Sequence, residues 1–161
     1  MSVDVTILLA DAANLDDAGR VNALGLGWEI IGPPPLSGFT VIVKLTASEE
    51  RRGERFTIRL QLLDSTGTPV VWGQKDPAEP LDVQFNVEVS RASTVPAGMK
   101  EGAAVILEMG PGLLLEPGIH EWVASVDGET KPHWRQPFYV RAKPDEFPRG
   151  SPKLPAPGPN P

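Results

Sequence analysis

The sequence contains no cysteine and only two histidines among its 161 residues. A chain without cysteine forms no disulfide framework and no thiolate metal site, and it has no thiol nucleophile. His120 and Glu121 begin like a zinc-protease motif, but the second histidine of that motif is missing. No Gly-x-Ser-x-Gly segment is present to carry a serine nucleophile. We therefore interpret His120 and His133 as structural residues, and we expect no catalytic residue, no cofactor and no enzyme activity.

Basic residues are few relative to acidic ones: the sequence has 15 Lys and Arg and 21 Asp and Glu, so the net charge is −6. A nucleic-acid binder needs a basic surface that displaces phosphate counterions, and this balance argues against one. Apolar runs are far shorter than the roughly 20 residues that span a bilayer. No basic segment followed by an apolar run, the signature of a secretory signal, is present. We expect a protein that is cytoplasmic at synthesis, with neither nucleic acid nor a membrane as partner.

Alternation of apolar and polar residues is the main pattern that is present. The alternating segments are 3–9, 39–45, 56–62, 83–89, 122–126 and 134–140. This period of two places one face of a strand on a core and the other face in solvent. Helical spacing never persists, because proline and glycine interrupt almost every longer window. The sequence therefore predicts an all-β protein.

Turn residues separate the alternating segments. Asp64–Gly67 and Asp127-Gly128 are typical of β-hairpins, in which glycine supplies a positive φ. Gly32 precedes three consecutive prolines, which have no N–H to donate to a ladder, so we expect a stiff segment that passes between sheets. Short strands at regular spacing are typical of a sandwich or a barrel. We favour an immunoglobulin-like antiparallel β-sandwich of about eight or nine strands.

Two glycines, Gly25 and Gly27, resemble the start of a dinucleotide-binding loop. The third glycine of that motif is missing and no helix follows, so a phosphate site is not predicted. We expect instead that these glycines allow a bulge or the close crossing of another strand.

The composition changes at the C-terminus, where seven of the last eighteen residues are proline. Such a segment favours extended polyproline II and cannot bury a core. We therefore divide the chain into a β-sandwich domain over 1–142 and an extended Pro-rich tail over 143–161. The tail has two interpretations, a disordered terminus or a strap that docks on a partner.

Aromatic and proline residues provide the candidates for partner binding. Trp28, Trp122 and Trp134 fall at alternating strand positions and are interpreted as core, whereas Trp72 stands at a strand end before Gly73. An exposed tryptophan is a frequent anchor at protein interfaces. The candidate partner-binding residues are Trp72, Pro33, Pro34, Pro35, Phe147, Pro155 and Pro157.

Acidic loops are the remaining polar feature. If successive strands run antiparallel, alternate loops meet at one end of the sandwich, and we expect 11–17, 48–53, 75–80 and 109–117 to lie there. Oxygen-rich loops can bind calcium, which takes six to eight oxygen ligands. The candidate ligands are Asp11, Asp16, Asp17 and Asp76. Nearby basic residues and the lack of a calcium-loop spacing favour a solvated rim over a metal site.

Several motifs resemble an uncharacterised family of small bacterial and phage β-sandwich proteins. They are Val5–Asn14, Gly19–Gly25, Leu62–Gly67, Pro117–Trp122 and Val126–Glu129, within a likeness that extends from about Val3 to Val140. The resemblance implies a compact β-sandwich, and it implies no activity.

Two classes of function follow from these observations. The first is a non-enzymatic interaction or structural module of a larger assembly, for example a capsid-decorating or tail-associated protein of a phage virion, with protein partners or further copies of itself. The second is a module that binds a small ligand or calcium through the acidic loops. A hydrolytic enzyme is disfavoured, because adjacent carboxylates such as Asp16 and Asp17 point apart and cannot flank one bond.

Overall fold

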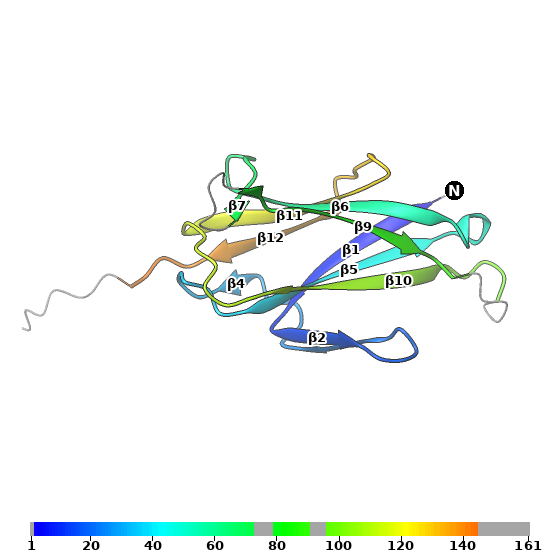
Figure 1. The fold of residues 1–161 in the computed structure, drawn as a ribbon, viewed down its shortest axis with the longest axis horizontal. Helices are drawn as coiled ribbons and strands as arrows, with labels where there is room; N and C mark the ends of the chain where they lie inside the picture. The colour runs from blue at the N-terminus through cyan, green and yellow to red at the C-terminus, as the bar shows by residue number, and fades with distance from the viewer. Residues whose placement is uncertain (1, 73–78, 91–95, 145–161) are drawn as a thin grey trace, which may run out of the picture.

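The chain forms two facing β-sheets (Figure 1). The computed structural model describes residues 2–72, 79–90 and 96–144, and in these residues it contains strands, one short 3₁₀ helix and no α-helix. One sheet has the strand order β1-β5-β10 and the other has the order β4-β12-β11-β6-β9. Two small hairpins, β2-β3 and β7-β8, complete the described fold. The strands are β1 Val3–Ala10, β2 Ala12–Leu15, β3 Val21–Leu24, β4 Ile30–Ile31, β5 Phe39–Ala47, β6 Arg55–Leu63, β7 Val71–Trp72, β8 Glu79–Pro80, β9 Asp82–Glu88, β10 Glu101–Met109, β11 Gly118–Val126 and β12 Arg135–Val140.

The core lies between the two sheets and consists of the apolar faces that the alternation predicts. Val3, Val5, Ile7 and Leu9 on β1 are all buried, and β5, β6 and β11 contribute in the same way. Burial of each large apolar side chain contributes roughly 1.5–3 kcal/mol. The all-β prediction is therefore confirmed, and so is the interpretation of two tryptophans as core, because Trp122 and Trp134 are almost fully buried.

Strand β10 was not predicted, because its sequence does not alternate. Its odd-numbered residues, such as Val105 and Leu107, pack against the core between the sheets. Its even-numbered residues lie on the outer face of the three-stranded sheet, where β2 contacts both β10 and β5. Both faces of β10 are thus partly covered. Its sequence is therefore a continuous apolar run without alternation.

The expected gathering of acidic loops at one end is wrong. Residues 11–38 return the chain to the end at which β1 finishes, so β5 runs antiparallel to β1 and the loop 48–53 lies at the opposite end. Residues 12–15, expected to be part of a loop, instead pair with Val21–Leu24 in the hairpin β2-β3, which lies along the outer face of the three-stranded sheet (Figure 1). Asp16 and Asp17 lie in the turn of that hairpin, away from Asp11 at its base.

The predicted turns and crossing are confirmed. Gly67 has φ +79° and its N–H donates to Asp64 O, and Asp127 and Gly128 both have positive φ in the turn after β11. The proline segment joins β4 in the five-stranded sheet to β5 in the three-stranded sheet, so it passes between the sheets as expected.

Strand β12, the last in the described part of the chain, ends at Val140. Residues 145–161 lie outside the described residues, and the extended tail and the domain boundary at 142 stay predictions. Across the ranges 2–72, 79–90 and 96–144, no helix has the length and apolar character needed to span a membrane.

Candidate functional site

One end of the two-sheet body collects several of the segments expected to contact partners. Strands β1, β6, β10 and β12 finish at this end, and β5, β9 and β11 begin there. We call it the β4 end. It contains the proline crossing 32–36, the hairpin β7-β8 and the loop 110–117, and the chain leaves β12 there (Figure 1).

Three large apolar side chains lie side by side on the outer face of the five-stranded sheet at the β4 end. Tyr139 of β12 pairs with Ile30 of β4 on one side and with Ile119 of β11 on the other. These side chains are 44%, 53% and 58% exposed, in the order Tyr139, Ile30 and Ile119. We call these three residues the apolar row. Phe138 and Val140, the neighbours of Tyr139, are buried, so Tyr139 points away from the core.

Backbone hydrogen bonds hold Ile30 beside Tyr139 at the edge of the sheet. The N–H of Tyr139 donates to Glu29 O at 2.8 Å, and the N–H of Arg141 donates to Ile31 O at 3.1 Å. These two bonds hold the short strand β4 parallel to β12. Ile31 packs on the core, and Ile30 is therefore directed outward.

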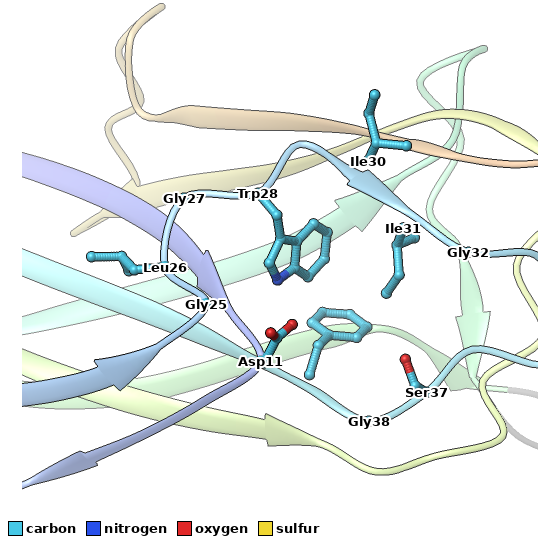
Figure 2. A pocket seen from close by; sticks show the side chains of 11 residues that line it. Asp11, Gly25, Leu26, Gly27, Trp28, Ile30, Ile31, Gly32, Ser37 and Gly38 are labelled. Carbon is cyan, nitrogen blue, oxygen red and sulfur yellow. The ribbon is translucent and has the colours of Figure 1, made fainter.

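A hollow of about 520 Å³ adjoins the apolar row, with Ile30 on its rim (Figure 2). The ring of Trp28 lies in it and makes edge-on contacts with Phe39 and Phe138, with ring centroids 5.4 and 6.0 Å away. The ring of Trp28 packs against core residues, which confirms the prediction that it belongs to the core. The side chain is, however, only partly buried. The Nε1 of Trp28 is buried and has no hydrogen-bond partner among the described residues.

The Asp11 carboxylate lies on the same side of this hollow as the Trp28 nitrogen (Figure 2). The N–H of Asp11 donates to Leu24 O at 2.9 Å, and the N–H of Gly27 donates to Leu9 O at 2.7 Å, so the segment from Leu24 to Gly27 crosses the end of β1. A Cβ on Gly25 would overlap the Asp11 carboxylate. The expected close crossing is thus confirmed at Gly25, whereas an added Cβ at Gly27 would meet no atom within 4 Å.

The three metal candidates in the described residues, Asp11, Asp16 and Asp17, are not brought together into a metal site. Asp16 is engaged within its own turn, where its carboxylate accepts the N–H groups of Ala18 and Arg20 and pairs with the Arg20 guanidinium at 2.7 Å. These hydrogen bonds, led by that from the Arg20 N–H, lower the pKa of Asp16. Asp76 lies outside the described residues. Within the described ranges, no three Asp, Glu or His side chains are grouped closely enough to hold a metal ion.

The predicted partner-binding residues fall into two groups. Pro33 and Pro35 are exposed at the β4 end, Pro34 is half-buried, and the backbone of Trp72 pairs with Glu79 in the hairpin β7-β8. The predictions for Phe147, Pro155 and Pro157 fall outside the described residues.

Each histidine contacts another side chain of the fold. His120 is buried and stacks on Phe138 at 5.7 Å, and burial lowers its pKa. His133 lies on the surface, with its Nε2 2.7 Å from Asp4 Oδ1. The same Asp4 oxygen accepts the indole N–H of the buried Trp134 at 2.7 Å. Hydrogen bonds from Trp134 and His133 lower the pKa of Asp4, against the opposing effect of burial.

The sequence did not single out the apolar row. Ile30 and Ile119 are far apart in the chain, and strand pairing with Tyr139 brings them together. The sequence does carry one local signal, at Tyr139. In an alternating strand the outward position between two core residues is ordinarily polar, and here an aromatic residue occupies it.

The fold and this surface define an all-β protein with an exposed apolar site at one end. The chain belongs to DUF6941, a family of unknown function whose model matches residues 5–141, in agreement with the resemblance to an uncharacterised family. Comparison with curated proteins finds no match.

Solved structures give distant likenesses. A β-glucosidase from Listeria innocua in complex with glucose has a TM-score of 0.45 and 11% identity over 88% of this chain. The alkylpurine DNA glycosylase AlkC of Pseudomonas fluorescens, bound to DNA containing an abasic site analog, has a TM-score of 0.37 and 15% identity over 71% of this chain. The chain spans 16% of the first protein and 28% of the second.

Proposed function

We propose that this protein is a non-enzymatic interaction module of a larger assembly, and that it contacts a protein partner through the β4 end. The observation that carries the proposal is the apolar row. Large apolar side chains scattered singly on a surface are ordinary, whereas contiguous ones mark interaction sites. Ile30, Tyr139 and Ile119 are contiguous because their strands pair at these positions.

The hollow beside the row adds to this support. Interface anchors are aromatic or apolar side chains that enter pockets near the centre of a contact and lose their water there. The hollow is lined by the ring of Trp28 and by the Asp11 carboxylate. A partner side chain with an apolar body and a polar end would match these groups.

We further propose that the scaffold is immunoglobulin-like, and the strand order supports this. In chain order the long strands are β1, β5, β6, β9, β10, β11 and β12. The first, second and fifth of these form one sheet, and the third, sixth and seventh lie together in the other. Immunoglobulin domains divide their strands A, B, E and C, F, G in the same way. The fourth strand, β9, pairs with the third instead of joining the first sheet.

A pair of matched variants tests the proposed function. Ile119 and Met99 are 58% and 57% exposed, and Met99 lies beside Arg52 at the opposite end of the body. Tagged full-length protein is isolated from its source cells as wild type, Ile119→Asp and Met99→Asp, and the co-purifying proteins are quantified by mass spectrometry. Truncation of a central apolar anchor typically weakens binding by tenfold or more, roughly 1.4 kcal/mol.

We expect Ile119→Asp to lose a defined set of partners by about tenfold or more, while Met99→Asp retains them. Both variants should melt close to the wild type, since surface substitutions typically change stability by about 0.5 kcal/mol or less. Equal recovery with both variants would contradict the proposed surface. A third variant that lacks 144–161 separates the contribution of the Pro-rich segment from that of the row. A phage particle stays one prediction for the assembly, and the identity of the recovered partners tests it.

A further inference from the structure

Strand β10 forms one edge of the three-stranded sheet. It pairs with β5 on one side over its whole length, and no described strand pairs with its other side. Residues 102–107 read Gly-Ala-Ala-Val-Ile-Leu and contain no charge and no proline. Proteins usually protect an edge with charges, prolines, bulges or a covering segment, because exposed backbone groups pair with other strands. The uncharged middle of this edge, residues 102–107, is therefore suited to pair with a further strand.

The two sheets leave the core partly open along the same side. Strand β9 is the corresponding edge of the five-stranded sheet. Val83 and Phe85 on β9, and Val105 and Leu107 on β10, pack against the core without being fully buried. A strand added to β10 would direct every second side chain toward this open side and would bury these residues further.

We propose that β10 pairs antiparallel with β10 of a second copy of this chain, with the two-fold axis at Ala104. In a symmetric antiparallel pair, the residue numbers of facing partners have a constant sum, and facing side chains lie on the same face of the sheet. Because even-numbered side chains of β10 face outward and odd-numbered ones face the core, that sum must be even. The axis therefore passes through a residue.

Charge selects among the possible axes. An axis at Ala104 places Lys100 of each copy opposite Glu108 of the other, and opposite charges that face each other across strands stabilise a sheet. Lys100 and Glu108 are both exposed, and within the described residues neither forms an ion pair. An axis at Val105 would instead place Glu108 opposite Gly102, and an axis at Ala103 would place it opposite Gly98. Pairing through Ala104 is thus the register that gains two ion pairs.

The Pro-rich segment of the same chain does not suit this edge. Proline has no N–H to donate, and seven prolines lie between residues 144 and 161. In contrast, Lys100 to Glu108 contains no proline, so a second copy supplies a donor at every position.

The test combines charge reversal with a disulfide probe, and both use the full chain. Sedimentation velocity from low micromolar to millimolar concentration should show a monomer–dimer equilibrium for the wild type. Each reversal, Lys100→Glu or Glu108→Lys, places like charges opposite each other twice per dimer, and we expect association to weaken at least tenfold. The double variant Lys100→Glu/Glu108→Lys restores opposite charges and should recover most of the affinity.

Because the chain has no cysteine, a single introduced thiol reports the register directly. Ala104→Cys places two thiols across the axis, where facing Cα atoms are about 4.5–5.5 Å apart and a disulfide fits. Ile106→Cys is the matched control, because Ile106 faces Gly102 of the other copy and the two thiols lie about four residues apart along the strands. Mild oxidation should cross-link the first variant and leave the second monomeric on a denaturing gel.

Three results would overturn the inference: a monomer at all concentrations, a double charge variant as weak as the single ones, or equal cross-linking of the two cysteine variants. The apolar row is a separate surface on the other sheet. Ile119→Asp should therefore leave the dimer unchanged, so failure of the dimer and failure of the proposed function are distinguishable.

Discussion

Gly25 is the position at which a single methyl group should disturb the hollow beside the apolar row. Its φ is +61°, in the left-handed region, and an added Cβ would overlap the Asp11 carboxylate and lie 3.2 Å from the Asp11 Cβ. Gly25→Ala therefore combines two effects. It strains the backbone, and it forces the Asp11 carboxylate to leave its position beside Gly25.

Gly27 separates these two effects. It has φ +87°, and an added Cβ there would have no neighbour within 4 Å. Gly27→Ala should thus cost only the backbone strain, roughly 1–2 kcal/mol for a non-glycine residue in this region. Gly25→Ala should cost about 0.5–1 kcal/mol more, the lower part of the range for coupling between residues in contact. For a chain of this size, each 1 kcal/mol lowers Tm by about 2–4 °C.

The assay is urea denaturation of five proteins: the wild type, Gly27→Ala, Gly25→Ala, Asp11→Ala and the double variant Asp11→Ala/Gly25→Ala. If the carboxylate is the obstacle, Asp11→Ala should relieve the additional cost. The cost of Gly25→Ala measured in the Asp11→Ala background should then match the cost of Gly27→Ala in the wild type. The reasoning is refuted if Gly25→Ala and Gly27→Ala destabilise the protein equally and the Asp11 substitution shows no coupling.

Two further predictions concern the groups with lowered pKa values. Asp4→Ala should cost about 1–3 kcal/mol of unfolding free energy, because it leaves the buried Trp134 N–H without its acceptor, and chemical denaturation measures this. The pKa of Asp4 is lowered in the fold, so the ionised Asp4 contributes to the unfolding free energy above its unfolded pKa of about 3.9. This contribution is lost as the pH falls below that value. A wild-type advantage over Asp4→Asn that persists unchanged to about pH 2 would contradict this. Burial also lowers the pKa of His120, so the folded state favours the neutral ring, and stability should fall as pH drops below the unfolded value of about 6.5. His120→Phe should flatten this dependence between about pH 7 and pH 5, and an unchanged slope in urea melts would rule the explanation out.

The strands that alternate could be predicted from the sequence, and those covered on both faces could not. In β1, β5, β6 and β11, one face meets the core, so the period of two is visible locally. In β10 the core covers one face and the hairpin β2-β3 lies over the other, which removes the polar residues that mark a strand. The segment Ala12–Leu15 is short enough to resemble a loop, and its pairing with Val21–Leu24 places the acidic turn away from Asp11.

The candidate site depends on pairings that no local pattern encodes. The proline crossing and the two hairpin turns follow from residues that lack an N–H or that tolerate positive φ, and these were predicted correctly. The apolar row depends on the register of β4, β12 and β11, which is set by long-range hydrogen bonds. The expected acidic cluster failed for the same reason, because loop ends are placed by sheet topology and not by the order of loops alone.

The central claim is that the apolar row contacts a protein partner, and site-specific photo-crosslinking tests it most directly. A benzophenone amino acid is placed at Ile119, and in a control at Met99, which has nearly the same exposure at the opposite end. The account predicts a discrete cross-linked product in source cells from position 119, absent from position 99 and reduced when Ile30→Asp is also present. Absence of any product from position 119, or the same products from both positions, would contradict it.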